Sequence, residues 1–245
     1  MIDVFLNLRS GSNKVVFLGQ SALTVENRQK KGLPFFFRNS WVDDITCSTV
    51  IFNDPTLYLY DDLLAGWSQG SPQTFGIPAM ASVCEQILAT IGDGAEFGFY
   101  GSSAGGFWAL MMSGYMQAPC AVETPQTNMM AYPLEKPKEL LLKRCYRDHG
   151  LNPNDFLHRL SVVDWFDHLG TLPTKIQFYQ SREDLGHVKS QMEPFMERMA
   201  SRVPLTQTLY DRDAGKPPHG PMKKVQSLAV INGLLTAPGV KVVGT

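Results

Sequence analysis

A glycine-rich turn between an expected strand and an expected helix restricts the fold of this chain more than any other feature. Residues 96–100 have the pattern of a strand, and residues 107–115 carry apolar side chains at helical spacing. The turn that joins them, residues 101–105, reads Gly-x-Ser-x-Gly. Such a turn holds its central serine in a strained backbone conformation, and the two glycines give the strand and the helix room to approach. This segment therefore predicts a layered α/β fold.

Strands and helices alternate along much of the remaining chain. Strands are expected at residues 15–18, 49–52, 119–123, 176–179 and 205–210, and helices at residues 80–91, 188–200 and 221–235. Alternation of this kind predicts a mostly parallel sheet with helices on both faces. At the start of the chain, residues 2–8 alternate apolar and polar side chains, and a turn at residues 11–13 leads to the strand at 15–18. These two strands are expected to pair as a hairpin.

Residues 124–170 interrupt the regular alternation with helical and irregular patterns, and we expect them to form a helical lid inserted into the sheet framework. With 245 residues and 44% hydrophobic content, the chain is long enough for one large domain with a complete core. We therefore expect a single domain over residues 1–245.

Composition excludes several classes of partner. Lys and Arg number 22 against 23 Asp and Glu, so the net charge of −1 gives no broad attraction to nucleic acid, and no nucleic-acid partner is expected. No stretch reaches the roughly 18 apolar residues of a membrane span, and residues 1–8 lack the pattern of an export signal. The four cysteines have neither a CxxC pair nor a histidine at metal-ligand spacing. A cytoplasmic location and no metal site are expected.

The turn at residues 101–105 makes Ser103 a candidate nucleophile. A serine hydroxyl keeps its proton near neutral pH, so it needs a base to take that proton and an acid to orient the base. The alternative is a phosphate-binding turn, which is expected near the first strand with an acidic residue about 20 positions later. This turn follows several strands, which favours the nucleophile.

The acid and the base follow the serine in the expected order. Asp184 lies just past the expected strand at 176–179, and His219 lies in a glycine- and proline-rich loop after the last strand. Asp184 would hold the imidazole of His219 in the correct tautomer. Glu183 is adjacent and remains the alternative acid, while an exposed loop histidine is the alternative for His219. His187, three residues after Asp184, either lines the site or caps the next helix, and a supporting role is favoured.

An oxyanion hole needs two N–H donors directed at the developing negative charge. Ala104, the residue after the serine, is expected to supply one donor. Gln20 follows the early strand at 15–18 and is expected to supply the other, although Gly19 and Gln20 also fit an ordinary turn.

The chain resembles the α/β-hydrolase superfamily over nearly its whole length. The match rests on Gly101-Ser102-Ser103-Ala104-Gly105-Gly106, Asp184 and His219. It is also similar to the small bacterial branch linked to surface-polysaccharide and glycoprotein loci, which moves acyl groups to or from sugar hydroxyls. The similar stretches are Phe52-Asn53-Asp54-Pro55-Thr56-Leu57-Tyr58, Tyr100-Gly101-Ser102-Ser103-Ala104-Gly105-Gly106 and Asp184-Leu185-Gly186-His187-Val188. The lid does not align with any member.

The triad and the resemblance together predict an O-acyl esterase or O-acyltransferase that acts on a small-molecule or glycan substrate through an acyl-serine intermediate. No resident cofactor is expected, and a transferase would take an acyl donor such as acetyl-CoA. Two alternatives stay open: a binding protein that kept the hydrolase fold without turnover, and a thioesterase or peptidase with the same triad. The oligomeric state is also left open.

Overall fold

The computed structural model describes residues 1–236 and contains a seven-stranded sheet. Its strands are β1 (Val4–Asn7), β2 (Lys14–Leu18), β3 (Ser48–Phe52), β4 (Glu96–Ser102), β5 (Cys120–Glu123), β6 (Ile176–Ser181) and β7 (Leu205–Tyr210). They lie in the order β1-β3-β2-β4-β5-β6-β7, and every neighbouring pair is parallel except β1 with β3. The predicted mostly parallel sheet is confirmed. Residues 237–245 of the expected single domain lie outside the described residues.

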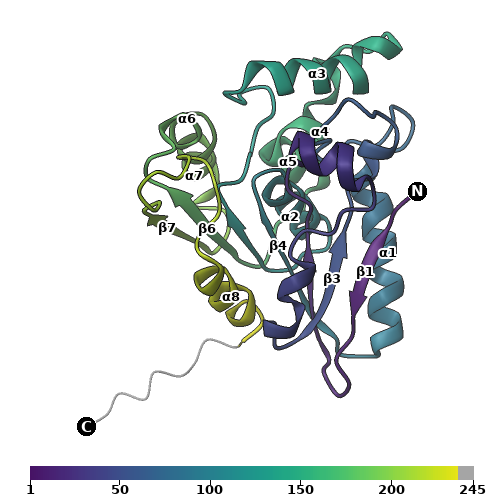
Figure 1. Ribbon diagram of the computed structural model, residues 1–245, viewed down its shortest axis with the longest axis vertical. Helices are drawn as coiled ribbons and strands as arrows, with labels where there is room; N and C mark the ends of the chain where they lie inside the picture. The colour runs from purple at the N-terminus through teal and green to yellow at the C-terminus, as the bar shows by residue number, and fades with distance from the viewer. Residues whose placement is uncertain (237–245) are drawn as a thin grey trace.

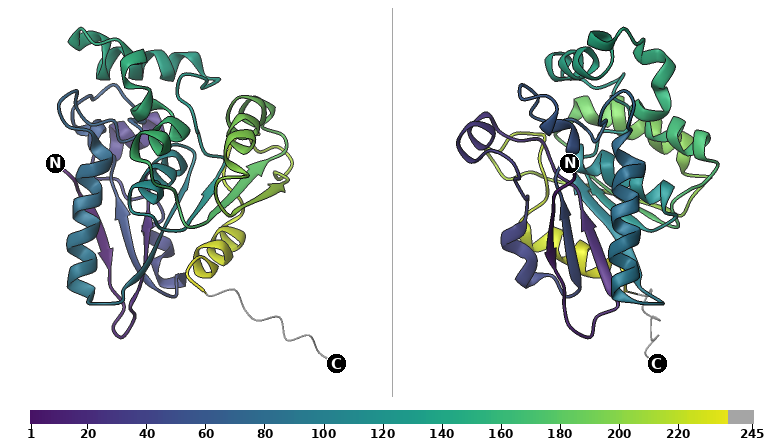
Figure 2. Two further views of the ribbon diagram at one scale, coloured as in Figure 1. Left: turned by 180° about the vertical axis from the view of Figure 1, so that it is seen from behind. Right: turned by 90° about the vertical axis from the view of Figure 1, so that its right-hand side faces the viewer.

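Helices cover both faces of the sheet, as Figure 2 shows. The α-helices are α1 (Gly76–Ile91), α2 (Ala104–Tyr115), α3 (Glu135–Cys145), α4 (Leu157–Leu160), α5 (Val162–Leu169), α6 (Leu185–His187), α7 (Glu193–Met199) and α8 (Lys224–Gly233). Shorter helical turns are η1 (Asn27–Lys31), η2 (Asn39–Asp44), η3 (Pro55–Tyr58), η4 (Arg147–His149), η5 (Pro153–Phe156) and η6 (Val188–Met192). Within residues 1–236, no helix combines the length and the apolar character needed to cross a bilayer.

Each face of the sheet has its own apolar layer because successive side chains of a strand point to opposite faces. Phe17 and Phe99 belong to the larger cluster, which also includes buried residues of α1, α2, α5 and α7. Val16 and Tyr100 belong to the smaller cluster, which α8 and η2 cover. The sheet therefore packs against a larger apolar layer on one face and a smaller one on the other, and loops lie at the ends of its strands.

The predicted hairpin of the first two strands is wrong. β3 lies between them, pairing antiparallel with β1 and parallel with β2. Residues 15–18 of β2 are all buried, so this strand needs strand neighbours on both edges and helices on both faces, which a terminal hairpin does not provide. β1 has no fully buried residue and takes the edge position.

The segment expected as a lid, residues 124–170, divides into two parts. α3 lies over the carboxyl ends of the strands (Figure 1), whereas α5 packs against α2. The indole N–H of Trp165 in α5 donates to the carbonyl oxygen of Met111 at 3.0 Å. Phe166 lies where a side chain on Gly114 would otherwise be, since a Cβ there would come within 2.3 Å of the Phe166 ring. The α5 part belongs to the core, which leaves α3 as the part above the strand ends.

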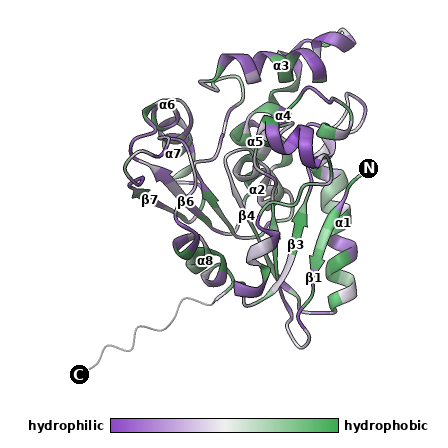
Figure 3. Ribbon diagram, in the orientation of Figure 1, coloured by the Kyte–Doolittle hydropathy of each residue, from purple (hydrophilic) through white to green (hydrophobic). Residues whose placement is uncertain are grey.

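The two sides of the sheet differ in polarity, and Figure 3 shows β3 as mainly hydrophobic and β6 and β7 as a mixture of hydrophobic and hydrophilic residues. All five residues of β3 are buried, whereas residues 206–208 of the edge strand β7 are exposed. A polar edge strand discourages pairing with the sheet of another molecule.

Candidate active site

The turn between β4 and α2 holds Ser103 at φ 54° and ψ −122°, a conformation that residues with side chains rarely adopt. Two glycines make this turn possible. A Cβ on Gly101 would lie 2.0 Å from the carbonyl oxygen of Gly105, and a Cβ on Gly105 would lie 2.6 Å from that of Gly19. The strand, the helix and the loop after β2 therefore meet backbone to backbone at the serine.

His219 lies in the loop between β7 and α8, residues 211–223, which is tied down on both sides of the histidine. The hydroxyl of Tyr210 donates to the carbonyl oxygen of Gly220 at 2.5 Å. The N–H of Met222 donates to the buried carboxylate of Glu123, at the end of β5, at 3.1 Å. These two bonds fix the position of the imidazole relative to β5 and β7.

Ser103, His219 and Asp184 form a continuous chain of hydrogen bonds. His219 Nε2 lies 2.9 Å from Ser103 Oγ, and His219 Nδ1 lies 2.6 Å from Asp184 Oδ2. Asp184 lies three residues after the end of β6 and is buried, whereas the His219 side chain is 30% exposed. The fold thus brings together three residues from three separate loops at the carboxyl edge of the sheet, each where the sequence places a candidate.

The adjacent acid, Glu183, points elsewhere. Its carboxylate accepts a hydrogen bond from Ser181 Oγ at 2.9 Å and others from the N–H of Arg212. It makes no hydrogen bond to His219 within the described residues. Of the two acids that the sequence left open, the one that contacts His219 is Asp184.

Asp184 is an ionised carboxylate in this arrangement. Burial raises the pKa of its carboxyl group, but hydrogen bonds from His187 and His219 outweigh burial and hold the pKa well below its ordinary value. A charged carboxylate can accept hydrogen bonds on both oxygens, and both are used here, one by each histidine.

The two expected oxyanion donors, Ala104 and Gln20, lie at the start of α2. Ala104 is the first residue of α2, where backbone N–H groups lack partners within the helix. The backbone of Gln20 runs next to Gly105, as close as 3.1 Å from the position of a Cβ there, and its side-chain oxygen accepts from the N–H of Asp54 at the end of β3. Among the described residues, the backbone N–H groups of Gln20 and Ala104 donate to no protein acceptor.

Comparison with known proteins gives structural relatives only. The sequence matches no protein-family model and none of the curated protein sequences. An S-formylglutathione hydrolase from Agrobacterium tumefaciens is similar over 95% of this chain and 92% of its own, with 14% identity and a TM-score of 0.56. A Pyrobaculum calidifontis esterase covers 97% of this chain and 86% of its own, with 14% identity and a TM-score of 0.59.

A mutant of the capsule O-acetyltransferase of Neisseria meningitidis serogroup A, in complex with CoA, is similar over 96% of this chain and 91% of its own, with 10% identity and a TM-score of 0.60. The chain has the α/β-hydrolase fold. In open α/β sheets, ligands bind outside the carboxyl ends of the strands. In this α/β-hydrolase fold, Ser103, Asp184 and His219 lie at that edge.

Three further side chains belong to the site, and sequence reasoning gave no role to two of them. His187 Nδ1 lies 2.9 Å from Asp184 Oδ1. Gln126 Nε2 lies 3.2 Å from both His187 Nε2 and Ser103 Oγ, and Gln126 Oε1 accepts from the indole N–H of Trp67 at 3.0 Å. Gln126 follows β5 by three residues, so its place at the carboxyl edge was the one available signal, and no motif marked it.

The acid and the two histidines of the site form a cluster of potential metal ligands. Asp184, His187 and His219 offer ligand atoms within 4.8 Å of one another, the one such group found in residues 1–236. Both carboxylate oxygens already accept from the two imidazoles. An ion would have to replace these hydrogen bonds, so the arrangement fits proton transfer between Ser103 and His219.

Proposed function

We propose that this chain is a serine-dependent acyl-transfer enzyme that removes an acyl group from a carbohydrate hydroxyl or transfers one to it. The observation that carries the proposal is the hydrogen-bond chain from Asp184 through His219 to Ser103 Oγ, at 2.6 Å and 2.9 Å, in a strained turn at the start of a helix. Nucleophile, base and orienting acid in this geometry define a reaction class.

Acylation follows from the geometry. His219 Nε2 takes the proton of Ser103 as Oγ attacks the carbonyl carbon of the ester. The oxygen of the tetrahedral intermediate becomes negative, and the N–H groups of Ala104 and Gln20 stabilise it. His219 then gives its proton to the leaving group as the bond between the carbonyl carbon and that group breaks, which leaves an acyl group on Ser103.

The second step decides between an esterase and a transferase. Water or a sugar hydroxyl gives a proton to His219 and attacks the acyl carbon, and the proton then passes to Ser103 Oγ as the acyl–serine bond breaks. A hydroxyl acceptor needs access to His219, whose side chain is 30% exposed. The partial exposure of this histidine supports access by an acceptor from solvent.

The carbohydrate substrate is supported by the fold relatives, among which is a capsule O-acetyltransferase that binds CoA. We carry its kind of reaction over to this chain, with acetyl-CoA or another activated ester as the donor for transfer. The other two relatives are hydrolases, which is why hydrolysis and transfer are proposed together.

Labelling with a fluorophosphonate probe tests the nucleophile. We expect the wild-type chain to be labelled and Ser103→Ala to be unlabelled, because only a serine activated by His219 attacks the probe. Incubation with p-nitrophenyl acetate, with and without glycan acceptors, and location of the acyl adduct by mass spectrometry then separate hydrolysis from transfer. A folded wild-type chain without label would favour the alternative of a binding protein.

A further inference from the structure

Asp184 is held by two histidines, and the proposed acyl transfer uses only one of them. We propose that His187 and Gln126 form a second arm of the active site: Gln126 is a catalytic donor to Ser103 Oγ, and His187 is a positioning residue for Gln126 and Asp184. This inference rests on the proposed function. The arm closes a ring of hydrogen bonds that runs from Ser103 through His219, Asp184, His187 and Gln126 back to Ser103.

The donors and acceptors of the ring can be assigned by starting from the indole N–H of Trp67, which contacts Gln126. The indole N–H of Trp67 only donates, so the atom of Gln126 that it contacts must be the amide oxygen. The amide NH₂ of Gln126 then faces Ser103 Oγ and His187 Nε2. His187 Nε2 must accept, so this histidine carries its proton on Nδ1.

The rest of the ring follows without conflict. The Nδ1–H of His187 donates to Asp184 Oδ1, and the Nδ1–H of His219 donates to Asp184 Oδ2. His219 Nε2 is thereby left to accept from Ser103. No two donors face each other, which indicates a network built for one protonation state.

Burial and packing hold this arm in place. Gln126 is fully buried, and His187 and Trp67 are each 3% exposed. The rings of His187 and His219 are stacked, with centroids 4.2 Å apart and an angle of 23° between them. A buried polar network that is fully satisfied fixes the rotamers of its members. His187 therefore fixes the carboxylate of Asp184 through Oδ1, next to His219, which bonds to Oδ2.

The position of Gln126 gives it a role in both chemical steps. When His219 takes the proton of Ser103, negative charge grows on Oγ, and the amide N–H 3.2 Å away stabilises it. When the acyl–serine bond breaks in the second step, Oγ takes the electron pair of that bond and a proton from His219. The same N–H stabilises the oxygen as it leaves.

Two variants of His187 separate the halves of the arm. The short amide of His187→Asn can donate to Asp184, as Nδ1 does, but does not reach Gln126. The longer amide of His187→Gln can accept from Gln126, as Nε2 does, but leaves Asp184 Oδ1 with only the backbone N–H of residue 187 as a donor. We expect each to lower kcat about tenfold and His187→Ala to lower it about a hundredfold, with KM within about twofold, because hydrogen bonds to charged groups are worth roughly a factor of ten or more.

Variants of Gln126 test the catalytic donor. Gln126→Glu keeps the shape but replaces the N–H donor with an acceptor, and we expect kcat to fall by about a hundredfold, as with Gln126→Leu. Adding His187→Ala to Gln126→Leu should lower kcat about tenfold further and not a hundredfold, because the contact between Gln126 and His187 is already broken and only the one with Asp184 is still lost. His158→Asn is the matched control, since it removes a histidine that is stacked on His168 and takes no part in the ring.

The measurements are kcat and KM on p-nitrophenyl acetate, the rate of fluorophosphonate labelling and the melting temperature. Wild-type kcat in folded Gln126→Leu and His187→Gln would overturn the arm while Ser103 remains the labelled nucleophile. Equal losses in all three His187 variants, in step with their melting temperatures, would overturn it as well, because that result shows packing alone. A folded wild-type chain that is neither labelled nor active would instead refute the proposed function, and the arm with it.

Discussion

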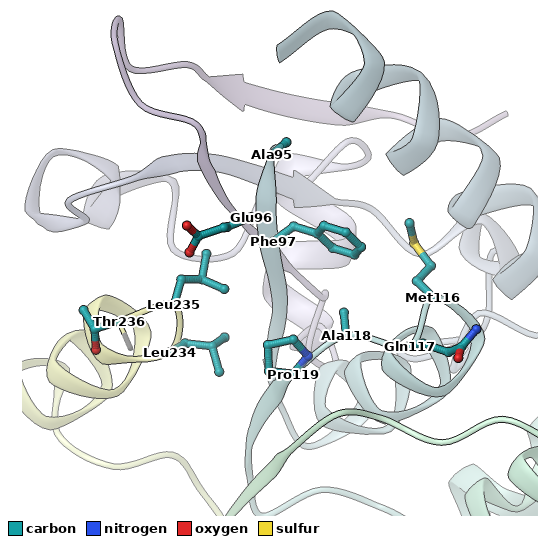
Figure 4. A pocket seen from close by; sticks show the side chains of 10 residues that line it. All are labelled: Ala95, Glu96, Phe97, Met116, Gln117, Ala118, Pro119, Leu234, Leu235 and Thr236. Atoms are coloured by element: carbon teal, nitrogen blue, oxygen red, sulfur yellow. The ribbon is translucent and has the colours of Figure 1, made fainter. Parts of the chain in front are cut away.

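The two ends of β4 differ: the amino end borders a pocket, whereas the carboxyl end leads to Ser103 and the candidate active site. At the amino end, the chain has a pocket of about 460 Å³ whose lining includes Glu96, Phe97, Met116, Pro119 and Leu234 (Figure 4). Its one carboxylate, Glu96, lies 3.5 Å from the ammonium group of Lys14. At the carboxyl end, Ser103 is part of a closed ring of hydrogen bonds with two histidines, an acid and Gln126.

The difference follows from strand direction. In a parallel sheet, the carboxyl ends of neighbouring strands meet at one edge, and the helices that follow them start there with free N–H groups. The loops after β4, β5, β6 and β7 therefore bring Ser103, Gln126, Asp184 and His219 together, whereas the residues that line the amino-end pocket include neither a serine nor a histidine. Volume alone does not identify the site in this fold.

The largest expected effect is at the carboxyl end. Asp184→Asn should keep the fold but lower kcat by about 10⁴-fold, because His219 is then left in the wrong tautomer. Glu183→Gln is the matched control and should cost far less, since Glu183 bonds to Ser181 and Arg212 instead. Steady-state kinetics on an activated ester measure both, and a crippled Glu183→Gln with an active Asp184→Asn would mean that Glu183 is the acid.

The triad residues should also act as a unit. Adding Asp184→Asn to Ser103→Ala should reduce kcat little below that of Ser103→Ala alone, because the route that Asp184 assists is already closed. His219→Ala should behave in the same way. Additive losses in the double variants would show that Asp184 acts outside the pathway through Ser103.

The turn between β4 and α2, which holds Ser103 at the carboxyl end, should be destabilised when one methyl group is added to Gly101. Gly101→Ala places a Cβ 2.0 Å from the backbone of Gly105, so we expect a loss of about 1–3 kcal/mol in the free energy of unfolding, or failure to fold. At about 2–4 °C for each kcal/mol, the melting temperature should fall by several degrees. Gly233→Ala is the control, because nothing lies within 4 Å of a Cβ there.

The ionised carboxylate of Asp184 should make the stability of the chain depend on pH. The pKa of Asp184 is lowered in the folded chain, so its ionised form stabilises the fold above the ordinary carboxyl value of 3.8, and this contribution declines as the pH falls toward the folded-state pKa. The unfolding free energy of wild type relative to Asp184→Asn should therefore decrease from about pH 5 to about pH 2. Urea denaturation at several pH values measures it, and a difference that does not change with pH would contradict the lowered pKa.

The smallest effect is expected at the amino end. Ala95→Phe fills the pocket and Glu96→Gln removes its carboxylate, and neither should change kcat/KM by more than about twofold, as for substitutions outside a site. A large and specific loss of activity in either variant would mean that the amino-end pocket takes part in the reaction.

The sequence predicted the class of fold correctly but not which strands pair within the sheet. Alternating strands and helices predicted the mostly parallel sheet, because that pattern has few other solutions. The first two strands were placed in a hairpin, and the structure inserts β3 between them. Neighbouring segments in sequence are a good guess for neighbours in a sheet, but the burial of residues 15–18 on both faces required a central position for β2.

At the site, the residues alone predict the turn around Ser103 and the order in which an acid and a histidine follow it, because these depend on local chemistry and on chain order. The folded chain shows what the residues leave open: Asp184 and not Glu183 faces His219, and His187 holds the other oxygen of the same carboxylate. It also placed Gln126 against Ser103. These are contacts between loops that follow different strands, and their geometry depends on how the sheet is assembled, which no local pattern encodes.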